Sequence, residues 1–176
     1  MKYCRVLSAD LIILSTLVRK ARSFASRSGF EQAWFLPCWL LLGASRLAIL
    51  AIPFRHLAPC LGISIGVASW VPLAGSCGEA TALSIARTVQ MAARHAPWTS
   101  NCFPQALTAR LLLGLYGVPY SFFFGIANDT ESAAFKAHAW VSAGRVNVTG
   151  GNSFGHFTVV GCFVTPYLAT AVQDLG

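Results

Sequence analysis

Charged residues are scarce in this chain of 176 residues: they make up 11% of it, against 55% hydrophobic residues. Carboxylates are the rarest, with 6 Asp and Glu against 13 Lys and Arg, which gives a net charge of +7. A basic chain can bind nucleic acid, an anionic membrane or acidic peptides. Beyond the cluster Arg19, Lys20 and Arg22 the cations are scattered, and no stripe of cations alternates with aromatic residues. We therefore expect no nucleic-acid partner.

The chain also lacks the usual metal and redox motifs. None of its 6 cysteines forms a C-x-x-C pair, and no H-E-x-x-H spacing is present, so we expect no metal site. Asp10 interrupts the N-terminal apolar run, and no clear cleavage site for an exported segment follows. A chain this large and apolar does not need disulfide staples. We expect reduced thiols in a cytoplasmic protein, most of them filling the core.

Long charge-free runs are few and interrupted. The apolar stretch 34–54 contains Pro37, Arg46 and Pro53, and the stretch 57–78 has no charge but contains Pro59 and Pro72. The second stretch also lacks the flanking basic and aromatic residues of a clean membrane span. We expect both to form buried helices beside a core, with membrane association as the less favoured alternative.

Turn residues mark the boundaries of the predicted domain and of its helices and strands. Ser28-Gly29 predicts a basic N-terminal extension over residues 1–29, for which a helix is one option, ahead of a single domain over residues 30–176. Periodicity predicts helices over 31–50, 79–94 and 103–116, and strands over 120–126, 135–142, 145–149 and 157–164. In the second helix Leu83, Ala86, Val89 and Gln90 share one face. Helices followed by hairpins predict an α+β fold, with N-terminal helices packed on a small antiparallel sheet.

Cys102 stands at the start of the third predicted helix. Ser100 or Asn101 can cap that helix, and Pro104 suits its first turn, where a missing N–H costs little. The thiolate is the nucleophilic form of cysteine, and a helix N-terminus favours it. Cys102 is therefore the candidate nucleophile.

His138 lies on the predicted strand 135–142. The two-residue period places it on one face with Lys136, Trp140 and Ser142, and places the small Ala137 and Ala139 on the other. The small side chains favour close packing of the sheet against a helix. If Cys102 begins that helix, His138 can act as its general base, which is the arrangement of papain-like and transglutaminase-like enzymes.

Alternatives remain at each position. A lone cysteine is more often core filling, and a lone histidine on a strand is more often a satisfied structural residue. For the group that orients His138 the sequence offers the Asn152 amide, with Asn147, Thr149 or a main-chain carbonyl as alternatives. For an oxyanion hole it offers the Cys102 N–H and the side chain of Gln105.

At these residues the chain resembles the lasso peptide biosynthesis B protein family, leader peptidases with a transglutaminase-like fold. The resemblance covers residues 31–163. It is carried by the order and spacing of several motifs, namely Trp39-Leu40-Leu41-Leu42, Arg46-Leu47-Ala48, Pro53-Phe54-Arg55, Ala96-Pro97-Trp98, Asn101-Cys102-Phe103-Pro104-Gln105-Ala106-Leu107, Gly117-Val118-Pro119, Ala137-His138-Ala139-Trp140-Val141, Val148-Thr149-Gly150-Gly151 and His156-Phe157.

The resemblance implies a transglutaminase/papain-like core and a cysteine peptidase that removes the leader from a ribosomally made precursor peptide. It implies Cys102 as nucleophile and His138 as general base, with no cofactor bound directly. Many family members have an aspartate as third residue; here 148–152 offers Thr149 and Asn152 instead, and the Thr-Gly-Gly form also occurs in the family.

The resemblance also implies partners. Some members carry a fused leader-recognition domain, for which residues 1–29 are too short, so we expect a separate leader-recognition protein. We further expect cooperation with an ATP-using, asparagine-synthetase-like cyclase. Two other functions compete with this interpretation: a transglutaminase-like acyltransferase using the same Cys and His, and a non-enzymatic membrane-associated scaffold.

Overall fold

The structure is a computed structural model that describes residues 19, 22, 24–128 and 135–166. The N-terminal extension lies largely outside these residues, and its division from the domain stays a prediction. The elements in chain order are α2 (Gly29–Ala51), α3 (Phe54–Leu57), the 3-10 turn η1 (Ala58–Cys60), β1 (Ile63–Gly66), α4 (Ser76–Arg94), α5 (Cys102–Leu115), β2 (Ser121–Asn128), β3 (Phe135–Ala143), β4 (Val146–Asn147), η2 (Ser153–Gly155) and β5 (Thr158–Val164).

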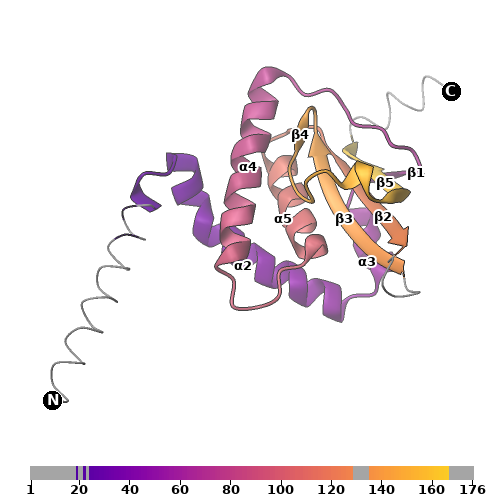
Figure 1. Cartoon of the computed structure of the whole chain (residues 1–176), viewed down its shortest axis with the longest axis horizontal. Helices are drawn as coiled ribbons and strands as arrows, with labels where there is room; N and C mark the ends of the chain where they lie inside the picture. The colour runs from indigo at the N-terminus through magenta and orange to yellow at the C-terminus, as the bar shows by residue number, and fades with distance from the viewer. Residues whose placement is uncertain (1–18, 20–21, 23, 129–134, 167–176) are drawn as a thin grey trace, which may run out of the picture.

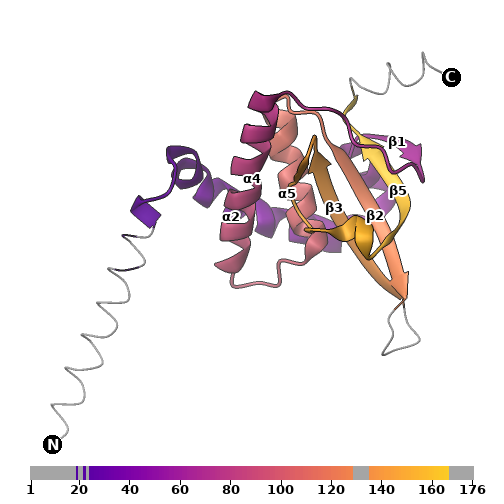
Figure 2. The same cartoon turned by 45° about the horizontal axis from the view of Figure 1, so that its top comes forward.

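Five strands form one antiparallel sheet in the order β1-β5-β2-β3-β4 in the described part of the chain. Helix α5 lies between α4 and the sheet and packs against β3, while α2 packs across both α4 and α5 (Figure 1, Figure 2). The predicted α+β class, with helices on a small antiparallel sheet, is confirmed.

The sheet separates two apolar clusters, because alternate residues of a strand point to opposite faces. Ala139 and Val141 of β3 pack with α5, α4 and α2 in the larger cluster. Trp140 and Phe123 lie in the smaller cluster on the other face, together with Cys162. The predicted division of β3 is thus confirmed for Ala139 on the helix side and for Trp140 on the other, whereas Ala137 is exposed.

The prediction of a buried helix over 57–78 is wrong. This stretch holds only the end of α3, the turn η1 and strand β1 before an extended segment leads to α4, and most of it is exposed. Gly62 and Gly66 take positive φ angles of 134° and 77°, which a helix does not allow. The β-branched Ile63 and Ile65 between them favour a strand. One strand therefore precedes α4, so the predicted order of helices first and sheet second is also wrong here.

The expectation of a buried helix over 34–54 is only half correct. Cys38, Leu42 and Ser45 of α2 are buried against the domain, whereas its outer leucines are exposed. Among the described residues, α2 is the helix that is long and apolar enough to cross a membrane by length and composition. The strand predicted over 145–149 is shorter than expected, since β4 covers Val146–Asn147 alone.

Gly125 is a point where the sheet leaves no room for a side chain. A Cβ there would lie 2.7 Å from Cζ3 of Trp140 and 3.0 Å from Cβ of Phe157. We predict that Gly125→Ala lowers the free energy of unfolding by about 1–3 kcal/mol, measured by urea denaturation. Gly114→Ala is the matched control: a Cβ there meets nothing within 4 Å. In helix α5 this alanine should stabilise by up to about 1 kcal/mol. Equal effects of the two changes would contradict the packing described.

Candidate active site

Cys102 is the first residue of α5, with Asn101 at the N-cap position. The Asn101 side chain makes no capping hydrogen bond, and Cys102 itself is half-buried. The first backbone N–H groups of a helix have no partner within the helix. The thiol therefore lies beside the unpaired N–H groups at the start of α5.

Helix α2 holds the loop that leads into Cys102. Arg46 donates a hydrogen bond to the Thr99 carbonyl, and the Trp39 and Trp98 rings pack with centroids 4.5 Å apart. A Cβ at Gly43 would lie 3.0 Å from the Trp98 ring, so the helix backbone approaches the ring closely. These contacts fix the main chain just before Cys102.

Gln105 supports the same loop from the other side. Its Nε2 donates to the Ser100 carbonyl at 2.7 Å. The side chain thus has a structural partner, and its oxyanion role stays a prediction. Within the described part of the chain, the buried Ser100 hydroxyl and Trp98 indole N–H have no hydrogen-bond partner. Buried polar groups are usually paired, so these two donors next to Cys102 are unusual.

His138 lies on the sheet face that α5 does not cover. Its ring stacks on Phe157 with centroids 4.7 Å apart and lies 5.9 Å from the Trp140 ring, both members of the smaller apolar cluster. In the described part of the chain, β4 pairs only with Ser142 and Ala143 of β3, so it does not pair with β3 beside His138. The imidazole is therefore half-buried at an open edge of the sheet.

Burial lowers the pKa of His138 below its ordinary value of 6.5, and a hydrogen bond to the Gly150 backbone opposes this shift by raising it. A bond that raises a histidine pKa is one the ring donates, so the Gly150 carbonyl is the acceptor. Burial is the larger effect. The ring is then neutral near pH 7, which is the form that can accept a proton.

The polar contact of the His138 ring is with the backbone of Gly150, and a main-chain carbonyl is one of the alternatives that the sequence left open. The Thr149 hydroxyl accepts a hydrogen bond from the Val141 N–H instead, and the Asn147 amide oxygen accepts one from Ser142. Asn152 is exposed at the start of η2. Gly150 fits because it has no side chain: a Cβ there would lie 3.0 Å from Nε2 of His138. Catalytic roles for Asn152, Asn147 and Thr149 stay predictions.

The elements that carry Cys102 and His138 pack together, but α5 contacts the face of β3 opposite His138, so this packing does not by itself bring the thiol to the imidazole. Helix α5 packs against β3, which carries the histidine. No hydrogen bond joins the thiol to the imidazole in the described part of the chain. Catalytic hydrogen bonds are often long in a ligand-free enzyme and shorten when substrate binds.

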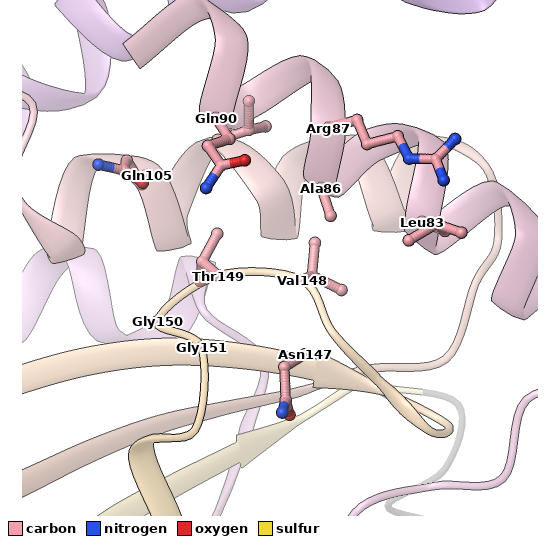
Figure 3. A pocket seen from close by; sticks show the side chains of 11 residues that line it. Leu83, Ala86, Arg87, Gln90, Gln105, Asn147, Val148, Thr149, Gly150 and Gly151 are labelled. Carbon is pink, nitrogen blue, oxygen red and sulfur yellow. The ribbon is translucent and has the colours of Figure 1, made fainter. Parts of the chain in front are cut away.

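A cavity of about 240 Å³ lies between α4, α5 and the loop after β4, and it is lined by residues near Cys102 and near His138. Gln105, one turn beyond Cys102, lines it together with Gly150, which contacts the His138 ring; neither Cys102 nor His138 is among its lining residues. The rest of its wall comes from α4 and the loop after β4, namely Leu83, Ala86, Arg87, Val89, Gln90, Asn147, Val148, Thr149 and Gly151. Figure 3 shows α4 and α5 on one side and this loop on the other. The α4 face predicted from the sequence thus lines a cavity.

The other described cysteines differ from Cys102 in their surroundings. Burial raises the pKa of Cys38 and of Cys162 to about 12, which keeps both thiols protonated and unreactive. Cys60 and Cys77 are exposed, so the expectation that they fill the core is wrong. All five cysteines of the described residues have unpaired thiols.

The family comparison matches residues 48–162 to the Transglutaminase-like superfamily. This segment contains Cys102, His138 and Gly150. The match covers most of the chain, and the protein belongs to this superfamily, whose members are mostly cysteine-dependent enzymes. Comparisons with curated proteins and with solved structures gave no match.

The lowered pKa of His138 makes stability depend on pH. Below about pH 6.5 the unfolded chain protonates this histidine more readily than the folded protein does, so stability is lost as the pH falls through that range. We predict that His138→Gln reduces this loss between pH 7 and pH 5, measured by urea denaturation at each pH. His156→Gln, at an exposed position, is the matched control for a histidine-to-glutamine change. A His138→Gln profile that parallels the wild type would contradict the assigned effect of burial.

Proposed function

We propose that this protein is a cysteine peptidase that removes the leader from a ribosomally synthesised lasso precursor peptide. The observation that carries the proposal is the position of Cys102 as first residue of α5, packed against the strand of His138 inside the transglutaminase-like segment. The resemblance of the motifs around both residues to the lasso peptide B proteins supplies the substrate class.

In the first step the neutral His138 ring takes the Cys102 proton, and the thiolate attacks the carbonyl carbon at the junction of leader and core. The Cys102 N–H, at the start of α5, is a donor for the resulting oxyanion. The Gly150 carbonyl stabilises the imidazolium, because it accepts a hydrogen bond from the ring.

In the second step the imidazolium donates its proton to the leaving amine, which becomes the free N-terminus of the core peptide. The leader remains attached to Cys102 as a thioester. Water, deprotonated by His138, then attacks the thioester and releases the leader as a carboxylic acid. The nearby cavity beside Gln105 and Gly150 can receive a side chain of the bound peptide.

The proposal also covers the partners, the cofactor and the location. A separate leader-recognition protein holds the precursor, and an asparagine-synthetase-like cyclase uses ATP to close the released core. The peptidase itself needs no cofactor for the two steps above. We place the reaction in the cytoplasm, where precursor peptides are made.

The cleavage itself is the direct test. We predict that Cys102→Ala and His138→Ala each lower cleavage of precursor, with the leader-recognition protein present, by at least about a thousandfold, since each removes a reacting group. Cys77→Ala, which removes an exposed thiol, is the matched control and should cleave normally.

Mass spectrometry of the products separates hydrolysis from acyl transfer. Hydrolysis adds one water to the leader, whereas a leader joined to an added amine identifies an acyltransferase. Cleavage by Cys102→Ala at the wild-type rate would exclude the mechanism altogether.

Coupling between the thiol and the imidazole can be tested without substrate. We predict that iodoacetamide at pH 6.5 modifies Cys102 faster than the exposed Cys60 and Cys77, and that His138→Ala lowers the Cys102 rate about tenfold or more. Peptide mapping of the alkylated protein gives each rate.

A glycine pair tests the same coupling through the position of the ring. Gly150→Ala should lower the Cys102 rate, because the new Cβ would lie 3.0 Å from the ring Nε2. Gly151→Ala is its control: both glycines have positive φ, but a Cβ at Gly151 meets nothing within 4 Å. Equal, slow alkylation of Cys60, Cys77 and Cys102 in every variant would show that the thiol has no base.

A further inference from the structure

The outer face of α2 is apolar along its whole length. Six exposed residues follow each other at intervals of three or four, which places them on one side of the helix: Ala33, Leu36, Leu40, Ala44, Leu47 and Leu50. The leucines among them are between 56% and 72% exposed. We call these residues the outer stripe. Exposed Ile52 and Phe54 continue it beyond the end of α2.

Positive charge flanks the outer stripe at both ends. Exposed Arg19 and Arg22 precede α2, and exposed Arg55 follows it. No carboxylate occurs in the sequence between Glu31 and Glu79. Glu31 is buried, with Arg27 at 3.8 Å, so it adds little negative charge to the surface. An apolar stripe with cations at its ends and no carboxylate matches the surface of an anionic lipid layer.

We propose that the outer stripe docks on the surface of an anionic lipid bilayer, with α2 lying in the plane of the interface. The buried contacts on the inner side of α2 argue against α2 crossing the bilayer. Cys38 and Leu42 are fully buried against the domain, and Arg46 holds the Thr99 carbonyl beside the nucleophile. Pulling α2 through a bilayer would break these contacts, whereas lying on the surface leaves them intact.

This docking is independent of the peptidase chemistry. The leucines would enter the boundary between headgroups and acyl chains, and the flanking arginines would lie at the headgroups, as in interfacial helices of peripheral proteins. The backbone of α2 is already hydrogen-bonded within the helix, so only side chains need to enter the lipid. The test below reads lipid binding alone, so its failure leaves the proposed function standing.

The experiment is flotation of the full-length protein with vesicles. Vesicles of phosphatidylcholine containing phosphatidylglycerol are compared with vesicles of phosphatidylcholine alone. We expect the protein to float with the anionic vesicles and only weakly with the neutral ones. Leu40→Gln/Leu47→Gln should weaken binding by at least about tenfold, because two leucines leave the lipid. Arg19→Gln/Arg22→Gln should weaken binding to the anionic vesicles by roughly fivefold per residue, with the loss disappearing at high salt.

Leu73→Gln/Leu115→Gln is the matched control. These leucines are 94% and 67% exposed and lie outside the outer stripe, so this double change should leave flotation unaffected. Absence of flotation with both kinds of vesicle, or an equal loss in the two leucine pairs, overturns the proposal. A dimer in size-exclusion chromatography that Leu40→Gln/Leu47→Gln dissociates also overturns it, and assigns the outer stripe to a second copy of the chain.

Discussion

Close packing of α5 against the sheet is the constraint on which both the fold and the site depend. Ala106 and Ala109 of the helix are fully buried, and Ala139 of β3 is nearly so. Small side chains at this interface let the helix approach the strand closely. The approach fixes Cys102 relative to β3, but it covers the face opposite His138. His138 therefore lies at the open edge of β3, on the side of the sheet away from α5, where its ring makes a hydrogen bond to the Gly150 backbone.

Helix α2 links the two unusual surfaces of the protein. Its inner side touches the loop before Cys102 through Trp39, Gly43 and Arg46. Its outer side carries the apolar stripe. A helix whose inner contacts hold the loop before Cys102 cannot be moved without displacing that residue. A charge placed on the inner side of α2, at buried Cys38 or Leu42, would therefore disturb the loop before Cys102 from a distance.

The sequence predicts the residues whose signals are local, and it fails where tertiary contacts decide. Capping and proline chemistry predict a helix from Phe103, one residue after its observed start at Cys102, and alternation predicts the faces of Ala139 and Trp140 in β3. Hydrophobicity alone does not distinguish a buried helix from an exposed strand, which is why the prediction of a buried helix over 57–78 is wrong. Gly62 and Gly66 could have indicated a break in that stretch. The Gly150 carbonyl could not be singled out, because every residue offers a carbonyl and only the folded loop brings this one to the imidazole.

The pairing of β1 with β5 has a consequence for how the chain folds. Ile63 pairs with Val164, so two segments that are far apart in sequence must meet before the sheet is complete. Such non-local pairing slows folding, since the chain between the segments must first be ordered. During synthesis α2, α4 and α5 leave the ribosome well before β5. Over that interval β2 lacks one neighbour and apolar strand surface is open to other chains, which makes the nascent protein prone to aggregation until its last strand arrives.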